Sequence, residues 1–297
     1  MIEGTEACTG WLVGSEGHLL TNQHCISTDE KAAMTDFEFN AESASCSEEC
    51  QQWEGCTGKI VATSATLVAV SSVYDYALLK LNTTEDLSTY GHLTLRVAGA
   101  IQDEQIYVPG HPSAWAKRIA AVDDDGNVTR ATKVGVSFAC GDYSVGYTAD
   151  TRGGSSGSPV IGASDNQVVA LHKCGGLDAV CVNGGTDIRT LIYDLKSNGV
   201  VLPNDAFSDP TANVPTGPWI PGSAKPPTPA PTPAPTTSLC KVFRQQTTCE
   251  NTIPGKVCLW LNGVCVPNAS ATPPFITPAP TQATPTPTEA PAQAPTP

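Results

Sequence analysis

The amino-acid sequence predicts an all-β body over the first two-thirds of the chain, with one helix after it and a proline-rich last third. Short apolar runs separated by turn residues fill the first two-thirds, a rhythm typical of proteins built from many short strands. All but three of the 25 prolines lie after Leu202, so the packed body is expected to end near that residue. A length of 297 residues is sufficient for one sizeable domain with appendages.

The expected strands are the apolar runs at 11–13, 19–20, 66–73, 77–81, 105–108, 133–138 and 167–171. A helix is expected after them, because apolar side chains recur at helical spacing from Ile188 to Leu195. Asp187 is placed to cap the start of this helix, and Gly199 to stop it.

Composition divides the chain into four segments: a body at 1–204, a Pro/Thr/Ala-rich linker at 205–237, a four-cysteine module at 238–267 and a low-complexity Pro/Thr tail at 268–297. The linker cannot form a core, and it is expected to stay extended as a semi-rigid spacer suited to O-glycosylation. Thirty residues bury too little surface to fold unaided, so two disulfides are expected to hold the module together.

Cysteine usage indicates a secreted, extracellular chain. The twelve cysteines divide into eight in the body and four in the module, and both numbers are even. Glycosylation sequons at Asn82, Asn127 and Asn268 agree with this compartment. The start at Met1 carries no signal peptide, and only seven residues precede Cys8, so we expect the N-terminal strand of the body to be truncated. The sequence contains no apolar run long enough to span a membrane.

The sequence implies no cofactor and no metal. Cys46, Cys50 and Cys56 form a cluster, but it lacks a fourth ligand at suitable spacing, so a disulfide-bearing loop is favoured over a metal site. The net charge of −13 argues against nucleic-acid binding, which requires a basic surface. An acidic secreted chain of this kind is expected to be a soluble monomer.

The segment from Gly154 to Pro159, Gly-Ser-Ser-Gly-Ser-Pro, has the pattern of a catalytic serine turn. Ser156 would be the nucleophile, with an oxyanion hole formed by the N–H groups of Gly154 and Ser156. Two partners lie upstream in a consistent order: His24 after one apolar run and Asp75 before another. The order histidine, aspartate, serine separates this pattern from other hydrolases that use the same three residue types.

From Cys8 to about Asn198 the chain resembles the trypsin-like serine peptidases of the two-barrel chymotrypsin fold, especially the branch of glutamyl and lysyl endopeptidases. The matching stretches are 8–13, 20–25, 75–81, 153–160 and 168–172. The resemblance implies a two-barrel body with a C-terminal helix and a secreted endopeptidase acting on proteins or peptides. Ser155 stands where the animal digestive enzymes carry an aspartate, so their mode of zymogen activation is not expected here.

The resemblance also implies disulfides. Cys8–Cys25 is the pairing that the family uses to tie the strand before the histidine loop. A Cys174–Cys181 bond would close a short loop beside the substrate pocket. Cys140 would then pair with one of the cysteines at 46, 50 and 56, and the other two would pair with each other.

The substrate preference is divided between two patterns. Asp150, six residues before Ser156, would favour lysine or arginine at P1 if its carboxylate were buried. Thr151 and His172 match positions that glutamyl endopeptidases use to bind an acidic side chain, although lysyl endopeptidases also carry a histidine in the latter context. The sequence slightly favours a basic P1, because an unpaired Asp150 would repel glutamate.

Two other functions are compatible with the sequence. The first is a catalytically silent relative that binds or inhibits a partner, although all three residues of the triad are present. The second concerns the module at 238–267, which would contact cell-wall or other glycans through Trp260 and Phe243. The competing interpretation is that these aromatic residues form the core of the small module.

Overall fold

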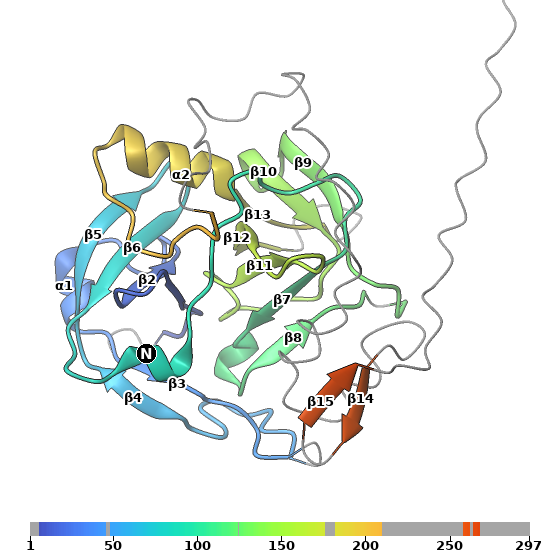
Figure 1. The fold of residues 1–297 in the computed structure, drawn as a ribbon, viewed down its shortest axis with the longest axis horizontal. Coiled ribbons are helices and arrows are strands. Elements are labelled where there is room, and N and C mark those ends of the chain that lie inside the picture. The colour runs from blue at the N-terminus through green and yellow to red at the C-terminus, as the bar shows by residue number, and fades with distance from the viewer. Residues whose placement is uncertain are drawn as a thin grey trace, which may run out of the picture.

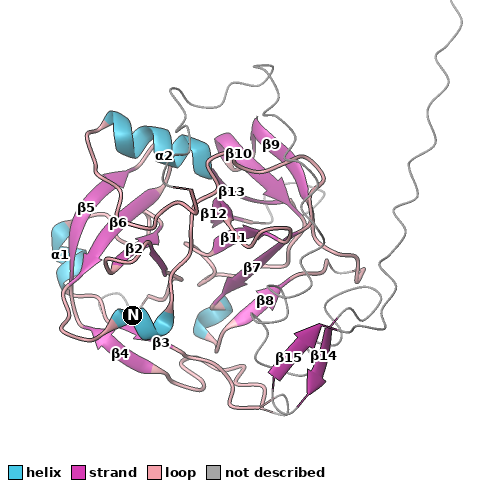
Figure 2. Cartoon of the chain, in the orientation of Figure 1, coloured by secondary structure: helices cyan, strands magenta, loops and turns pink. Residues whose placement is uncertain are grey.

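The computed structural model describes residues 6–45, 48–123, 125–175, 182–209, 258–261 and 264–267. Figure 1 shows two groups of strands side by side, an N-terminal group in blue and cyan and a C-terminal group in green and yellow. Figure 2 shows how little helix accompanies them. The predicted all-β class with a single substantial helix is therefore confirmed for the described part of the body.

The N-terminal group is an antiparallel four-stranded sheet in the order β1-β2-β6-β5, accompanied by a separate β3–β4 pair. Its elements are β1 (Trp11–Val13), β2 (His18–Thr21), α1 (Asp29–Ala33), β3 (Phe37–Phe39), β4 (Lys59–Ala62), β5 (Ala65–Ser71), β6 (Tyr76–Leu81) and the 3-10 turn η1 (Leu87–Tyr90). β6 is buried along almost its whole length, which explains its continuous apolar sequence. Leu79 and Leu81 of β6 pack with Leu12 and Leu19 in the core of this sheet.

The C-terminal group is a seven-stranded antiparallel sheet in the order β8-β7-β11-β12-β13-β10-β9. Its elements are β7 (Ile106–Gly110), the 3-10 turn η2 (Pro112–Ala114), β8 (Arg118–Ala120), β9 (Ala131–Phe138), β10 (Gly141–Tyr147), β11 (Pro159–Gly162), β12 (Val168–Cys174) and β13 (Asn183–Asp187). β11 begins just after the predicted serine turn, and β12 ends just beyond His172. This sheet therefore carries most of the candidate site.

The connection between the two groups pairs with both of them. Leu93 N–H donates to Leu12 O at 2.9 Å, and Arg96 N–H donates to Val168 O at 2.9 Å. Apolar side chains from both groups also share one core cluster, in which Leu20 packs with residues of the C-terminal half. The two halves are thus fixed relative to each other along their seam.

The predicted helix is present as α2 (Ile188–Ser197). The Asp187 carboxylate accepts from Arg189 N–H at 2.9 Å and caps the helix as expected. The helix ends at Ser197, and Gly199 follows with a φ of +74°. The apolar face from Ile188 to Leu195 is buried against the core.

The disulfides confirm one predicted pairing and correct two others. Cys8 is bonded to Cys25, as predicted. Cys174 is bonded to Cys140, with their Cα atoms 5.8 Å apart, so the predicted Cys174–Cys181 bond is wrong. The expected pairing of Cys140 within the 46–56 cluster is wrong for the same reason. Cys46 and Cys181 lie outside the described residues.

The physical reason for the correction is the topology of the C-terminal sheet. β13 lies between β10 and β12, and Gly184 of β13 stands opposite Cys174. A Cβ atom on Gly184 would lie 2.6 Å from the sulfur of Cys140. Glycine at this position therefore lets the disulfide cross over β13. The remaining bond, Cys50–Cys56, closes a short loop within the predicted cluster.

The segments beyond the body remain predictions. The linker, most of the four-cysteine module and the tail lie outside the described residues, as do Phe243 and the side chain of Trp260. Within the module, β14 (Cys258–Leu261) and β15 (Val264–Pro267) form an antiparallel hairpin. Among the helices of the described chain, none has the length and apolar character needed to cross a membrane.

Candidate active site

Asp75 lies in the tight turn that leads into β6. Its φ of +52° is in the left-handed region, which aspartate tolerates better than most residues. The Asn22 side-chain amide donates to the carbonyl oxygen of Asp75 at 2.8 Å and holds the turn in place. Asn22 comes directly after β2 and Asp75 directly before β6, and these two strands are neighbours in the sheet.

Two hydrogen bonds join His24 to Asp75. The His24 backbone N–H donates to Asp75 Oδ1 at 3.0 Å, and His24 Nδ1 lies 2.8 Å from Asp75 Oδ2. Burial would raise the pKa of the Asp75 carboxyl, but the bonds from His24 outweigh it and hold this pKa below its ordinary value. An ionised carboxylate can only accept, so Nδ1 carries the proton and Nε2 presents its lone pair.

The serine turn has the backbone that its glycines predict. Gly154 and Gly157 have φ values of +94° and +86°, in the region that favours glycine. A Cβ on Gly154 would lie 2.6 Å from the carbonyl oxygen of His111. Gly157 N–H donates to His172 O at 2.9 Å, and the Trp11 indole donates to Gly157 O at 3.1 Å. The turn is thereby held by both halves of the body.

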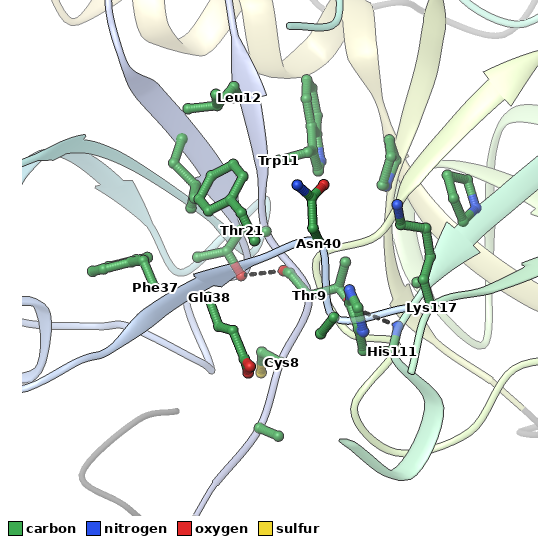
Figure 3. A pocket seen from close by; sticks show the side chains of 18 of the residues that line it. Cys8, Thr9, Trp11, Leu12, Thr21, Phe37, Glu38, Asn40, His111 and Lys117 are labelled. Carbon is green, nitrogen blue, oxygen red and sulfur yellow. Dashed lines mark hydrogen bonds between the residues drawn. The ribbon is translucent and has the colours of Figure 1, made fainter. Parts of the chain in front are cut away.

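Thr9 is the residue that joins the serine turn to the histidine loop. Its N–H donates to Ser156 O at 2.8 Å, and its hydroxyl donates to Gly154 O at 2.9 Å. The same hydroxyl accepts from His111 N–H at 2.9 Å, a bond drawn in Figure 3 together with that from Thr21 to Thr9. Thr9 follows Cys8, whose disulfide partner Cys25 is next to His24, so the predicted base and nucleophile are brought to the same seam.

The two predicted oxyanion donors are the N–H groups of Gly154 and Ser156, and neither is used by another described group of the protein. Ser113 N–H donates to Gly153 O at 2.6 Å, which fixes the peptide plane whose other end is the Gly154 N–H. No hydrogen bond among the described residues uses the N–H of Gly154 or of Ser156. Both donors are available to an oxygen placed beside Ser156.

A cavity of about 610 Å³ opens next to Ser156. It brings together the three predicted substrate-binding residues, Asp150, Thr151 and His172, and adds Lys173. Their environments differ: Asp150 is exposed, Thr151 is half-buried and His172 is only 3% exposed. Asp150 therefore borders the cavity in contact with solvent, whereas His172 belongs to its buried wall.

His172 is neutral in this wall. Burial, aided by the nearby charge of His24, lowers the pKa of its imidazole to about 4. Its Nδ1 lies 2.7 Å from the hydroxyl of Tyr147, which is buried and whose pKa burial raises. The bond with Tyr147 occupies Nδ1, so Nε2 is the ring nitrogen left for a ligand.

The histidine–aspartate pair and the cavity wall influence each other electrostatically. The charge of Lys173 contributes to the lowered pKa of Asp75, and His24 contributes to that of His172. Burial lowers the pKa of Lys173 itself, while Asp75 opposes that shift. The cavity wall and the pair therefore share one electrostatic environment.

Sequence reasoning missed four residues of the site: Thr9, Asn22, Tyr147 and Lys173. Three of them adjoin predicted positions, since Thr9 follows Cys8, Asn22 comes two residues before His24 and Lys173 follows His172. This proximity could have marked them. Tyr147 gave no such signal, because it reaches His172 only through the strand order of the C-terminal sheet.

The sequence of the body matches a known family. The model of the trypsin-like peptidase domain matches residues 8–171, more than half of the chain. The chain belongs to this family. Its mostly β architecture is accordingly the chymotrypsin-like fold, and its peptidase domain is related to serine proteases.

A curated relative and several solved structures are similar to the chain. Secreted RxLR effector protein 73 of Plasmopara viticola is 48% identical over 203 residues, which cover 68% of this chain and 48% of the relative. The chain thus spans about half the length of the curated relative it matches.

Three solved structures are similar to part of the chain. A Glu endopeptidase in complex with MPD is 19% identical with a TM-score of 0.44, over 67% of this chain and 87% of that chain. The serine endoprotease from Yersinia pestis is 15% identical with a TM-score of 0.45, over 65% of this chain and 59% of that chain. The MamO protease domain from Magnetospirillum magneticum is 17% identical with a TM-score of 0.43, over 65% of this chain and 88% of that chain.

Proposed function

We propose that the chain is a serine endopeptidase that uses Ser156, His24 and Asp75. The observation that carries the proposal is the 2.8 Å contact between His24 Nδ1 and Asp75 Oδ2 at the seam where Thr9 N–H holds the carbonyl of Ser156. This contact gives the imidazole the tautomer that a general base needs.

In the proposed reaction the Ser156 oxygen attacks the carbonyl carbon of a peptide bond, and His24 Nε2 takes the hydroxyl proton. The N–H groups of Gly154 and Ser156 stabilise the negative oxygen of the tetrahedral intermediate. The C–N bond then breaks, and His24 delivers the proton to the departing amine, leaving an acyl-enzyme. Water, deprotonated by His24, attacks the ester carbon, and the Ser156 oxygen leaves with a proton.

The test is covalent labelling of the secreted protein with a fluorescent fluorophosphonate. We expect labelling of the wild-type chain and none of Ser156→Ala. A folded wild-type protein that neither labels nor cleaves a peptide library would contradict the proposal and support the alternative of a silent binding or inhibitory homologue.

We further propose that the cavity prefers an acidic P1 side chain. In this proposal the buried Tyr147 phenol donates to His172 Nδ1, which leaves the imidazole proton on Nε2 as a hydrogen-bond donor of a residue that lines the cavity. Such a donor, with the Thr151 hydroxyl and Lys173 beside it, suits a carboxylate. The exposure of Asp150 weakens the argument for a basic P1, because a solvated carboxylate attracts a cation only weakly.

Cleavage of a peptide library, with the sites identified by mass spectrometry, distinguishes the two preferences. We expect cleavage after glutamate or aspartate, a loss of this preference in His172→Gln, and little change in Asp150→Asn. Cleavage after lysine or arginine that is abolished in Asp150→Asn would establish the basic preference instead.

We propose that the chain acts outside the cell. Three disulfides among the described residues and exposed sequons at Asn82 and Asn127 support this, as does the word "secreted" in the name of the relative. Endoglycosidase treatment should shift the mass of the secreted protein. Binding of the 238–267 module to cell-wall glycans remains a prediction, to be tested by pull-down of the full chain on insoluble polysaccharides.

A further inference from the structure

The loop closed by Cys50–Cys56 presents a large aromatic side chain to solvent. Trp53 lies in this loop and is 53% exposed, although tryptophan is the most costly side chain to leave in water. A turn in which Gly55 N–H donates to Gln52 O at 2.9 Å holds the backbone on either side of it. The disulfide and the turn restrict the loop, so Trp53 is displayed from a constrained backbone.

Two contacts attach this loop to the C-terminal half of the body. Glu54 N–H donates to the carbonyl oxygen of Ala114 at 2.9 Å. The guanidinium of Arg118, in β8, donates to the carbonyl oxygen of Glu49. The loop therefore bridges from the N-terminal half of the body to the segment 111–118.

The segment 111–115 in turn packs on the serine turn. Ser113 N–H donates to Gly153 O at 2.6 Å, and a Cβ on Gly154 would lie 3.1 Å from Ala114 N. Arg152 lies over the ring of Trp115 at 5.3 Å. One intervening turn thus separates the Trp53 loop from the proposed oxyanion hole.

The Trp53 loop borders a cavity that is distinct from the proposed P1 cavity. The P1 cavity is bordered by the residues 148–153 and by Ser156. Glu54 and Ala114 line a second cavity of about 480 Å³, shown in Figure 3, which shares no lining residue with the first. A peptide whose P1 side chain occupied the first cavity and whose carbonyl oxygen reached Gly154 N–H would extend its leaving-group residues past the serine turn, where the segment 111–115 carries the Trp53 loop.

We propose that Trp53 forms a subsite for a lysine or arginine side chain on the leaving-group side of the scissile bond. This inference rests on the proposed endopeptidase function. An exposed tryptophan is the best aromatic partner for a cation. The neighbouring Glu54 has an exposed carboxylate, which also attracts a cationic side chain.

The test compares the full secreted chain with Trp53→Ala, Trp53→Phe and a control, Val201→Ala. Val201 is an apolar residue that is 86% exposed and lies far from Trp53 in the sequence. The substrates are quenched fluorescent peptides that share one acyl half, the residues before the scissile bond. They carry arginine or glutamine at the first, second or third residue after that bond. A peptidyl 4-nitroanilide with the same acyl half has no residues there.

We expect Trp53→Ala to lower kcat/KM about two- to five-fold for the arginine peptide at one of these positions. The glutamine peptides and the anilide should change less than this, Trp53→Phe should retain most of the preference, and Val201→Ala should behave as wild type. Equal changes for arginine and glutamine, or no change for either, would overturn the subsite. Failure of the wild-type chain to hydrolyse the anilide would instead overturn the proposed function, so the two failures are distinguishable.

Discussion

Tyr147 and His172 are joined by a hydrogen bond of 2.7 Å between the phenol oxygen and Nδ1. They belong to β10 and β12, which are separated in the sheet by β13. Gly185 of β13 stands opposite His172 and carries no side chain between the strands. The bond ties the wall of the proposed P1 cavity to the interior of the C-terminal sheet.

The neutral state of His172 makes the folded protein sensitive to acid. Its pKa is about 4 in the folded state and 6.5 in an exposed imidazole, so between these values the unfolded chain binds a proton that the native chain does not. Stability is therefore lost as pH falls from 6.5 towards 4, by up to about 3 kcal/mol. Urea unfolding at pH 7 and pH 5 should show this loss.

The matched variant is His172→Gln, which cannot titrate in that range and should give a flatter pH profile. Asp75 also loses stabilisation on acidification, because its pKa is lowered, but that loss begins below its ordinary pKa of 3.8. Measurements above that value therefore separate the two groups. An identical slope in the wild-type chain and the variant would contradict the assignment.

Tyr147→Phe should weaken the proposed acidic P1 preference. Without the hydroxyl, Nδ1 loses its partner in a buried site, and the imidazole proton is no longer held on Nε2. We expect the ratio of kcat/KM for glutamate over glutamine at P1 to fall about ten-fold, with a loss of about 1–3 kcal/mol in stability. Fluorophosphonate labelling should persist, and an unchanged ratio would show that Tyr147 has only a packing role.

Local patterns were sufficient to predict α2 and most strands of the body. Asp187, the apolar face and Gly199 act within one helix, so their spacing carried the whole signal. β6 was recognised for the same reason, as a continuous apolar run. β13, Asn-Gly-Gly-Thr-Asp, could not be recognised, because glycine has a low strand propensity. Its glycines instead make room for neighbouring residues across the sheet.

Long-range relationships were predicted only where the motif order supplied them. The pairing of Cys8 with Cys25 and the grouping of His24 with Asp75 followed from the resemblance to a family. The Cys140–Cys174 bond did not, because it depends on β13 passing between the two cysteines. The attachment of the Trp53 loop to the segment 111–118 likewise depends on how the two halves meet.

Asp75→Asn should retain the fold and lose most of the activity. A carboxamide can present its oxygen or its amino group to His24, so the proton is no longer confined to Nδ1, and Nε2 ceases to be a reliable base. We expect kcat to fall about 10⁴-fold, the loss typical of this change in a Ser-His-Asp triad. The measurement is steady-state hydrolysis of the anilide, with Tm as the control. A fall of less than about ten-fold would exclude Asp75 as the orienting residue.

Removing the Cys8–Cys25 bond should destabilise the protein more than removing Cys50–Cys56. The two bonds join residues 17 and 6 positions apart, and the larger loop restricts the unfolded chain more. The expected losses are about 3 and about 2 kcal/mol. Paired alanine variants compared by urea unfolding test this order. The reverse order would show that the short loop contributes through its contacts with Ala114 rather than through chain entropy.

Arg96→Met should be among the most destabilising changes in the seam between the two halves. The buried guanidinium bonds to Glu104 and to Asp165 at 2.6–2.8 Å, and its backbone N–H donates to Val168 O. Methionine preserves much of the stem but leaves two carboxylates without their cation, at a cost of about 3–5 kcal/mol.

The control for this variant is Lys59→Met, which breaks an exposed pair with Glu85 and should cost far less stability, because solvent screens an exposed ion pair. Urea unfolding of both variants at neutral pH measures the difference. If the two variants lose equal stability, then solvent reaches the Arg96 cluster, and the rigidity of the seam depends on the shared apolar core and the pairing of Leu93 instead. If Arg96→Met loses much more stability than Lys59→Met, anilide hydrolysis should also fail at a lower temperature, because the proposed base His24 and the proposed nucleophile Ser156 come from opposite sides of this seam.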